Sequence, residues 1–389
     1  MSEHPITRAV RTRVERTNEM EHSSPLFLTS SFCFDNAEDM RAAFADETDD
    51  NIYSRFSNPS VQEFIDKVCA LEGAEAGFAT ASGMSAIFST FMTLLSAGDH
   101  MISFNAIFGS THTIITKYLP KWGITHDYLA VDQVESLKTL IKPTTKLIYL
   151  ETPTNPGLDV VDMQRVVDIA HEHGVIVVVD NCFATPIFQR PIEFGADLVI
   201  HSATKWIDGQ GRTLGGVIVG KPSLIKDIYT FCRSSGPALS PFNAWVLSKS
   251  LETLEVRMER HAQSALTVAQ ALEGHEKVSW VKYPHLKSHP NYEIAKRQMS
   301  SGGGVVCFEV KGGIESGRNF LNALKLFSMT ANLGDARSIA SHPASTTHAK
   351  LSEAERQQVN ITPGLIRLSI GLEKVDDLIA DVVQALEKA

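Results

Sequence analysis

The stretch Asp197-Leu-Val-Ile-His-Ser-Ala-Thr-Lys205-Trp206 decides how the rest of the chain is interpreted. It begins with the apolar run Leu198-Val-Ile200, which is typical of a buried parallel strand, and then changes to the polar segment Ser202-Ala-Thr-Lys205. Ligands of open α/β sheets bind beyond the carboxyl ends of the strands. Two hydroxyls and an amine at such an end could hold a phosphate and attack a carbonyl carbon. The alternative is a surface lysine after a strand, because such tetrapeptides are common.

Strands and helices alternate on both sides of this stretch. The apolar run Val175-Ile-Val-Val-Val179 is typical of a parallel strand that helices cover on both faces. Apolar periodicity also predicts strands over residues 100–104 and 146–150, and helices over residues 61–71, 109–119 and 162–173. The alternation predicts a large, doubly wound α/β domain with a mainly parallel sheet.

A glycine turn in Phe78-Ala-Thr-Ala-Ser-Gly-Met84 separates a predicted strand from a predicted helix. Free N–H groups and the positive dipole end at a helix N-terminus attract an anion, and Gly83 would let that anion come close. Phosphate binding at this turn is one interpretation. An ordinary N-cap formed by Ser82 is the other.

Asp180 directly follows the apolar run 175–179. A carboxylate at the end of a buried strand is costly unless it meets a cation or strong hydrogen-bond donors. A protonated ring nitrogen on a bound cofactor would be such a partner. The alternative is that Asp180 caps the loop that follows it.

The N-terminal segment, residues 1–60, has few periodic apolar positions and is broken by Pro5, Pro25 and the acidic segment 46–50. Such an arm needs another surface to pack on. Within it, Tyr53 and Arg55 would lie on the same side of an extended segment, although a solvated loop is the alternative.

The C-terminal third has the pattern of a smaller α+β domain. A long helical stretch over residues 241–272 is predicted to link it to the large domain, a strand is predicted over 305–310, and helices over 314–326 and 375–386. We therefore divide the chain into an arm (1–60), a large domain (61–250) and a C-terminal domain (251–389). The glycines of the segment 208–216 lack G-x-G-x-x-G spacing and precede a strand, which argues against a dinucleotide site.

The composition is that of an ordinary globular protein, with 43% apolar and 21% charged residues among 389. The formal net charge of −9, without a basic block, argues against nucleic acid or an anionic membrane as the partner. Five widely spaced cysteines without a C-x-x-C pair indicate neither a disulfide framework nor a metal site. The charged N-terminus has no apolar run of the length of a signal-peptide core, and no apolar run in the chain approaches a membrane span, so we expect a cytoplasmic protein that acts on small molecules.

Six ordered segments carry a resemblance to a known family. They are Tyr53-Ser-Arg55, Ser82-Gly-Met84, Glu151-Thr-Pro-Thr-Asn-Pro156, Val179-Asp-Asn181, Ser202-Ala-Thr-Lys205 and Arg367-Leu-Ser-Ile-Gly371. In order and spacing they resemble the pyridoxal-phosphate enzymes of cysteine and methionine metabolism, the trans-sulfuration enzymes. That family includes cystathionine γ-synthase, the cystathionine lyases, methionine γ-lyase and the homoserine-ester sulfhydrylases. The resemblance implies the aspartate aminotransferase-like fold (fold type I) of pyridoxal-phosphate transferases and a homotetramer built as a dimer of dimers.

The resemblance also implies a site for pyridoxal 5'-phosphate in the large domain. Lys205 corresponds to the Schiff-base lysine, Asp180 to the partner of the pyridine nitrogen, and Asn155 to the group beside the phenolic oxygen. An ion pair with Asp180 would keep the ring protonated and preserve its capacity as an electron sink. The implied phosphate ligands are Ser82, Gly83, Met84, Ser202 and Thr204 of one subunit, with Tyr53 and Arg55 of its neighbour.

The implied substrate site consists of Asn332 and Arg367, and arginine offers the planar fork that a carboxylate accepts. Lys205 and Tyr53 are the implied catalytic residues. Phe108 stands where many members place a tyrosine over the cofactor ring. Phenylalanine can stack on that ring but cannot transfer a proton, so any role of the hydroxyl moves to Lys205, Tyr53 or water, or is not required.

Three segments, residues 108–111, 332–338 and 342–348, resemble the O-succinylhomoserine sulfhydrylases most closely. Ser110 stands where methionine γ-lyases carry a cysteine, which counts against that activity. We therefore predict a γ-replacement that converts O-succinylhomoserine and sulfide to homocysteine and succinate in methionine biosynthesis. The alternatives are cystathionine γ-synthase or O-acetylhomoserine sulfhydrylase, then a methionine or cystathionine γ-lyase, and, outside enzymology, a regulator that binds the cofactor.

Overall fold

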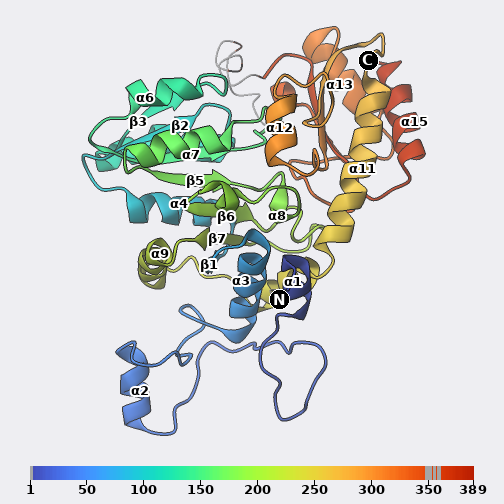
Figure 1. The fold of residues 1–389 in the computed structure, drawn as a ribbon. Coiled ribbons are helices and arrows are strands. Elements are labelled where there is room, and N and C mark those ends of the chain that lie inside the picture. Colours follow the sequence, from blue (N-terminus) through green and yellow to red (C-terminus); the bar gives the residue numbers. More distant parts are fainter. Residues whose placement is uncertain (1–2, 347–352, 354–355, 357–360) are drawn as a thin grey trace.

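A seven-stranded sheet forms the centre of the computed structural model, which describes residues 3–346, 353, 356 and 361–389 (Figure 1). The strand order is β1-β7-β6-β5-β4-β2-β3. The run from β6 to β3 is parallel, whereas β7 pairs antiparallel with both β6 and β1. This confirms the predicted mainly parallel sheet. The strands are β1 (Ala76–Thr80), β2 (His100–Phe104), β3 (Thr125–Leu129), β4 (Thr145–Glu151), β5 (Ile176–Asp180), β6 (Leu198–Ser202) and β7 (Gly216–Gly220).

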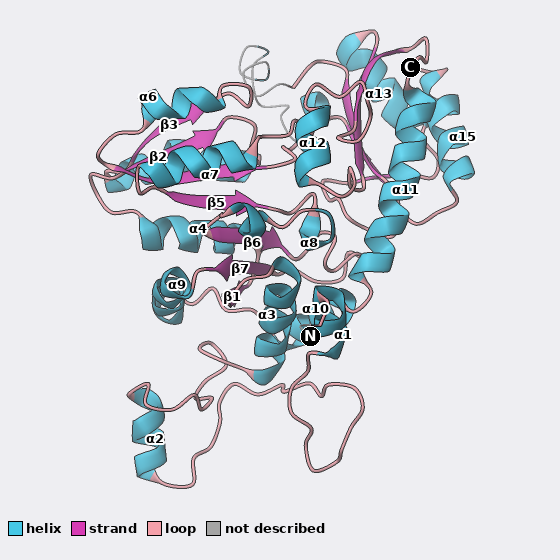
Figure 2. Ribbon diagram, viewed as in Figure 1, coloured by secondary structure: helices cyan, strands magenta, loops and turns pink. Residues whose placement is uncertain are grey.

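Helices cover both faces of this sheet, as Figure 2 shows for α4 (Gly83–Leu94) and α7 (Met163–Glu172). Successive side chains of a strand point to opposite faces of the sheet, so β5 contributes to two apolar cores. Val178 packs with α4, whereas Val177 and Val179 pack with α7. The other helices around the sheet are α3 (Pro59–Glu72), α5 (Gly109–Thr113), α6 (Leu137–Leu140), α8 (Thr185–Phe188), α9 (Pro222–Ser235) and α10 (Pro241–Leu251). The doubly wound arrangement is therefore confirmed.

Two predicted helices differ from the structure. The helix expected over 109–119 is α-helical only in α5 and continues as a π-helical turn, Ile114–Tyr118, and a 3-10 turn, Leu119–Trp122. The helix expected over 241–272 is wrong as one element, because it breaks at Glu252 and Thr253 between α10 and α11 (Leu254–Leu272). At the break the Ser250 carbonyl accepts hydrogen bonds from Thr253 N–H and from the side chains of Thr253 and Arg257, so local donors occupy the acceptor at the end of α10.

A second sheet of five strands, in the order β10-β11-β12-β9-β8, lies in the C-terminal part of the chain. Its strands are β8 (Val278–Lys282), β9 (Val305–Val310), β10 (Ser328–Met329), β11 (Ile339–Ser341) and β12 (Leu365–Ser369). Together with α11, α12 (Tyr292–Gln298), α13 (Gly313–Ala323) and α15 (Val375–Leu386) it forms the smaller α+β unit, with its own apolar core. The strand predicted over 305–310 and the helix predicted over 375–386 are confirmed.

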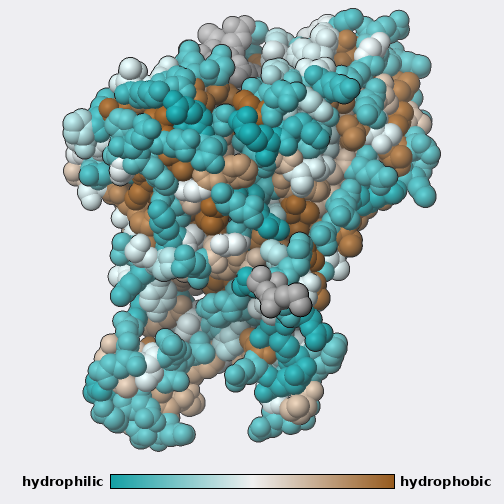
Figure 3. Space-filling view, viewed as in Figure 1, coloured by the Kyte–Doolittle hydropathy of each residue, from teal (hydrophilic) through white to brown (hydrophobic). Residues whose placement is uncertain are grey.

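The N-terminal arm packs on the body mainly through α1 (Pro5–Arg11), which contacts α3. Beyond it, the chain up to α3 hangs below the body with α2 (Ala37–Phe44) standing apart, and Figure 3 shows these segments as two protrusions. Met20 and Leu28 are about 70% exposed there. Within the described residues, no helix combines the length and the apolar character needed to cross a bilayer.

Asp381 on α15 offers a test of how the small unit is held together. Its buried carboxylate accepts hydrogen bonds from the backbone N–H groups of Lys325 and Leu326, at 2.8 to 3.1 Å. Replacing Asp381 with Ala leaves these donors without their acceptor, so we expect the free energy of unfolding to fall by about 1–3 kcal/mol. Urea unfolding measures the change, and an unchanged midpoint would contradict this account.

Candidate active site

A cavity of about 240 Å³ lies at the carboxyl ends of β4, β5 and β6, beside the N-terminus of α4. Residues from the second sheet's domain, including Arg367 on β12, close it from the other side. The predicted site residues that line this cavity are Ser82, Gly83, Met84, Phe108, Asn155, Asp180, Ser202, Thr204, Lys205 and Arg367. The fold thus brings together residues that are up to 285 positions apart in the chain, from Ser82 to Arg367. Their individual roles remain predictions.

One end of the cavity is suited to an anion. Ser82 caps α4 in a capping box with Ser85, so the first turn of this twelve-residue helix points its N–H groups and positive dipole end toward the cavity. Gly83 is necessary where α4 meets the end of β6, because a Cβ there would lie 2.6 Å from the Cβ of Ser202. Ser202 and Thr204 line the same cavity.

The other end carries two carboxyl groups side by side. Asp180 and Glu151 are register partners at the ends of β5 and β4, and the buried Tyr149 hydroxyl lies 3.3 Å from Asp180 Oδ2 and 3.5 Å from Glu151 Oε1. Burial raises the pKa of Asp180, although Cys182 N–H donates to its Oδ1 at 3.0 Å. A protonated ring nitrogen would give this carboxylate the cation that its burial requires.

Glu151 has a position that the sequence interpretation missed. Its Oε1 accepts the backbone N–H of Phe108 at 2.7 Å, and this bond fixes the residue whose half-exposed ring faces the cavity. Burial, and then the neighbouring Asp180, raise the pKa of Glu151 well above its ordinary value. The available signal was its place at the end of an apolar strand, the same signal that singled out Asp180.

Lys205 and Arg367 meet at Asn332. Lys205 Nζ donates to Asn332 Oδ1 at 2.6 Å, and Arg367 donates to the Asn332 carbonyl at 3.3 Å and to Asn155 Oδ1 at 2.9 Å. Burial lowers the pKa of Lys205, which raises the fraction of neutral amine at neutral pH. Arg367 is buried, and none of its contacts in the described residues is a carboxylate, so the site offers a planar cation to an incoming one.

Tyr53 and Arg55 lie outside this cavity. Tyr53 is 41% exposed, and Arg55 stacks on the ring of Phe56 and donates to the backbone carbonyl of Arg233. A single chain therefore does not bring these two residues to the predicted site. Their predicted place in a neighbouring subunit's site is untested by one chain and stays a prediction.

The donor set fits pyridoxal phosphate: an anion cradle, a carboxylate for a ring nitrogen and a poised amine line one cavity. A family model described as Cys/Met metabolism PLP-dependent enzyme matches residues 6–387. The chain belongs to this family. It is accordingly an enzyme that depends on pyridoxal phosphate, with the fold predicted from its sequence.

Curated relatives cover almost the full chain. An O-succinylhomoserine sulfhydrylase from Pseudomonas aeruginosa is 47% identical over 98% of this chain and 94% of its own length. An L-methionine gamma-lyase from Fusobacterium nucleatum subsp. nucleatum is 43% identical over 94% of this chain and 93% of its own length. The relatives therefore establish the family while dividing between two activities.

Solved structures agree with this assignment. A chain from Campylobacter jejuni subsp. jejuni, which carries N'-pyridoxyl-lysine-5'-monophosphate at its own position 205, matches with a TM-score of 0.95 and 35% identity. The match covers 99% of this chain and 100% of that one. The second domain's position relative to the large sheet is therefore shared as well, because the match spans both.

We expect Glu151 to make a pH-dependent contribution to stability that a glutamine at this position would not make. Glu151→Gln keeps an oxygen acceptor for the Phe108 N–H and removes the titrating proton. Folding raises the pKa of Glu151 above its ordinary 4.5, so the folded state binds a proton that the unfolded state releases. Relative to the variant, the free energy of unfolding of the wild type should then fall as the pH rises above about 4.5.

Urea unfolding of the cofactor-free protein between about pH 5 and pH 7 measures this difference. If the free energy of unfolding of the wild type, relative to that of Glu151→Gln, stayed constant or rose over that interval, folding would not raise the pKa of Glu151 and this prediction would be wrong.

Proposed function

We propose that this enzyme catalyses a γ-replacement that converts O-succinylhomoserine and sulfide to homocysteine and succinate. The observation that carries the proposal is the joint contact of Lys205 and Arg367 with Asn332. A substrate whose α-carboxylate binds the Arg367 fork has its Cα beside a lysine amine of lowered pKa. Sulfhydrylase relatives from Pseudomonas aeruginosa and Mycobacterium tuberculosis, 47% and 42% identical, support the choice of substrate.

The proposed roles follow from the chemistry of each side chain. Bound pyridoxal phosphate supplies an electron sink for negative charge at the substrate carbon atoms. Asp180 would pair with its ring nitrogen, Asn155 would lie beside its phenolic oxygen, and the α4 N-terminus with Ser202 and Thr204 would hold its phosphate. Lys205 Nζ would take the proton from Cα, since a neutral amine within hydrogen-bonding reach can act as a general base.

Phe108 favours an ester over a thioether as substrate. Succinate leaves Cγ as a carboxylate, whose conjugate acid has a pKa of about 4, so it needs no proton from the enzyme. A thiol leaving group such as that of methionine has a conjugate acid with a pKa of about 8.5 or higher and gains much more from a protein acid. The half-exposed phenyl ring of Phe108 cannot provide that acid.

A second candidate is γ-elimination from methionine, which the gamma-lyase relatives at 43% and 42% identity favour. An acetyl ester in place of the succinyl ester, or cysteine in place of sulfide, would give the neighbouring sulfhydrylase and cystathionine-forming reactions. A regulator that binds the cofactor without turnover is the remaining alternative.

We also propose the assembly and location that the sequence predicts: a cytoplasmic homotetramer, with the arm (1–60) completing a neighbouring chain's site next to the cofactor domain (61–250) and the C-terminal domain (251–389). The protruding arm with its exposed Met20 and Leu28 supports this, because such apolar side chains gain from burial against another chain.

A substrate panel tests the proposed reaction. The purified enzyme with its cofactor is assayed with O-succinylhomoserine, O-acetylhomoserine and L-methionine, each with sulfide, with cysteine and without a nucleophile. We expect kcat/KM to be highest for the succinyl ester with sulfide, by at least about tenfold over each rival, which corresponds to about 1.4 kcal/mol.

A preference for the acetyl ester, for cysteine or for methionine without a nucleophile would replace the proposal with the matching rival. Visible absorbance of the bound cofactor without turnover on any of these compounds would indicate a regulator.

A further inference from the structure

The turn that carries Lys205, residues 203–209, is held by few of its own backbone hydrogen bonds. Asp208 N–H donates to the Ala203 carbonyl at 2.9 Å and Gly209 N–H to the Lys205 carbonyl at 2.8 Å. In the described chain no backbone N–H donates to the carbonyls of Trp206 and Ile207. Buried carbonyls at the end of a helical turn require partners from elsewhere.

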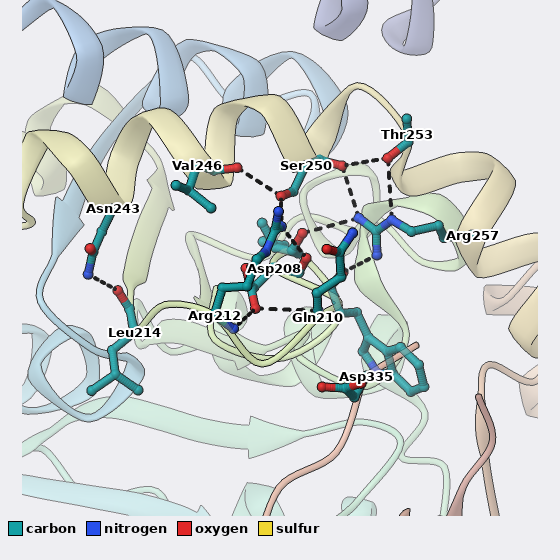
Figure 4. A network of polar contacts seen from close by, with 12 residues as sticks. Asp208, Gln210, Arg212, Leu214, Asn243, Val246, Ser250, Thr253, Arg257 and Asp335 are labelled. Atoms are coloured by element: carbon teal, nitrogen blue, oxygen red, sulfur yellow. Dashed lines mark hydrogen bonds and ion pairs between the residues drawn. The ribbon is translucent and has the colours of Figure 1, made fainter. Parts of the chain in front are cut away.

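Arg257 on α11 supplies those partners. Its guanidinium donates to the Trp206 carbonyl at 2.7 Å, to the Ile207 carbonyl at 3.1 Å and to the Ser250 carbonyl at 2.9 Å. Figure 4 shows its side chain directed at this region beside Ser250 and Thr253. The nearby Asp208 carboxylate accepts hydrogen bonds from Arg212 and not from Arg257. The buried guanidinium of Arg257 therefore donates to neutral backbone carbonyls.

The Arg257 guanidinium is desolvated by burial and packs closely against the turn. Burial lowers the pKa of Arg257 to about 10, so the guanidinium is still charged at neutral pH and remains a strong donor. Gly209 has φ +68°, and a Cβ at that position would lie 2.1 Å from Arg257 Nη1. Only glycine therefore leaves room for the guanidinium against the turn.

The opposite side of the turn is held by the segment 332–336. A Cβ at Gly334 would lie 2.6 Å from the Trp206 nitrogen, and Ala336 N–H donates to the Gly209 carbonyl at 2.8 Å. Asn332 receives the Lys205 amine itself. The turn thus lies between Arg257 on α11 and the segment 332–336, both from the C-terminal domain, and Lys205 lines the cavity beside it.

We propose that Arg257 is a positioning residue for Lys205: by fixing the carbonyls of Trp206 and Ile207 it sets where the lysine amine stands in the cavity. This inference rests on the role of Lys205 in the proposed function. Without the guanidinium the turn can shift, and a displacement of a reacting group by about 1 Å can lower a rate by about 10²-fold.

Three variants of the enzyme with its cofactor test the proposal: Arg257→Met, Arg257→Lys and Gly209→Ala, with Asp381→Ala as a control of lowered stability on the far side of the small domain. We expect Arg257→Met and Gly209→Ala to lower kcat by about 10- to 100-fold while KM changes little. Arg257→Lys should recover part of the rate, because an ammonium can reach one carbonyl but not the whole set.

A spectroscopic reading separates positioning from stability. If the turn relaxes, Lys205 becomes less buried, so the pH at which the visible absorbance of the lysine-bound cofactor changes should move upward in Arg257→Met and Gly209→Ala. Asp381→Ala should leave both kcat and this pH profile at the wild-type values.

Wild-type kcat together with an unchanged absorbance profile in the Arg257 variants would overturn the proposal. It would also be overturned if Asp381→Ala, at an unfolding midpoint equal to that of the Arg257 variants, lost as much kcat as they do. If Arg257→Met does not fold, Gly209→Ala and Arg257→Lys decide on the same readings. If the wild type forms no homocysteine but the absorbance profile still shifts, the reaction assignment fails and the positioning role stands.

Discussion

The hydrogen bond from Lys205 Nζ to Asn332 Oδ1 joins the large sheet to the C-terminal domain at the point where the chemistry is expected. The turn after β6 presents the amine, and the segment beyond β10 presents the acceptor. The same asparagine receives Arg367 on its carbonyl. The relative position of the two domains therefore sets the distance between the Lys205 amine and the Arg367 guanidinium, and the contacts of Gly334 and Ala336 with the turn that carries Lys205 support that position.

Burial is the main influence on the pKa values of the ionisable groups that line this cavity. Desolvation lowers the pKa of Lys205 and of Arg367, which favours the neutral amine at Lys205, and it raises the pKa of Glu151 and of Asp180. A substrate carboxylate at Arg367 and a ring cation of the cofactor at Asp180 would each pair with a buried charge and offset its desolvation cost. A site whose own groups leave these charges uncompensated is suited to a zwitterionic substrate and a charged cofactor.

The sequence predicted what local pattern can reveal. The strand over residues 175–179 and the position of Asp180 at its end could be predicted because a parallel strand covered on both faces is apolar along its length. Glu151 also follows an apolar run, but its place beside Asp180 depends on β4 pairing with β5, and its contact with the Phe108 N–H depends on the fold, neither of which spacing along the chain gives. The break at Glu252 and Thr253 coincides with a hydrogen bond from Arg257 to the Ser250 carbonyl, which the apolar periodicity of residues 241–272 does not reveal. The predicted place of Tyr53 and Arg55 in a neighbouring subunit's site stays a prediction.

Borohydride reduction followed by peptide mass spectrometry identifies the lysine that binds the cofactor. Reduction converts the lysine linkage to a stable secondary amine, which marks the residue. We expect a pyridoxyl adduct on the peptide that contains Lys205 and no adduct in Lys205→Ala. An adduct on another lysine, or one that survives the substitution, would contradict this expectation.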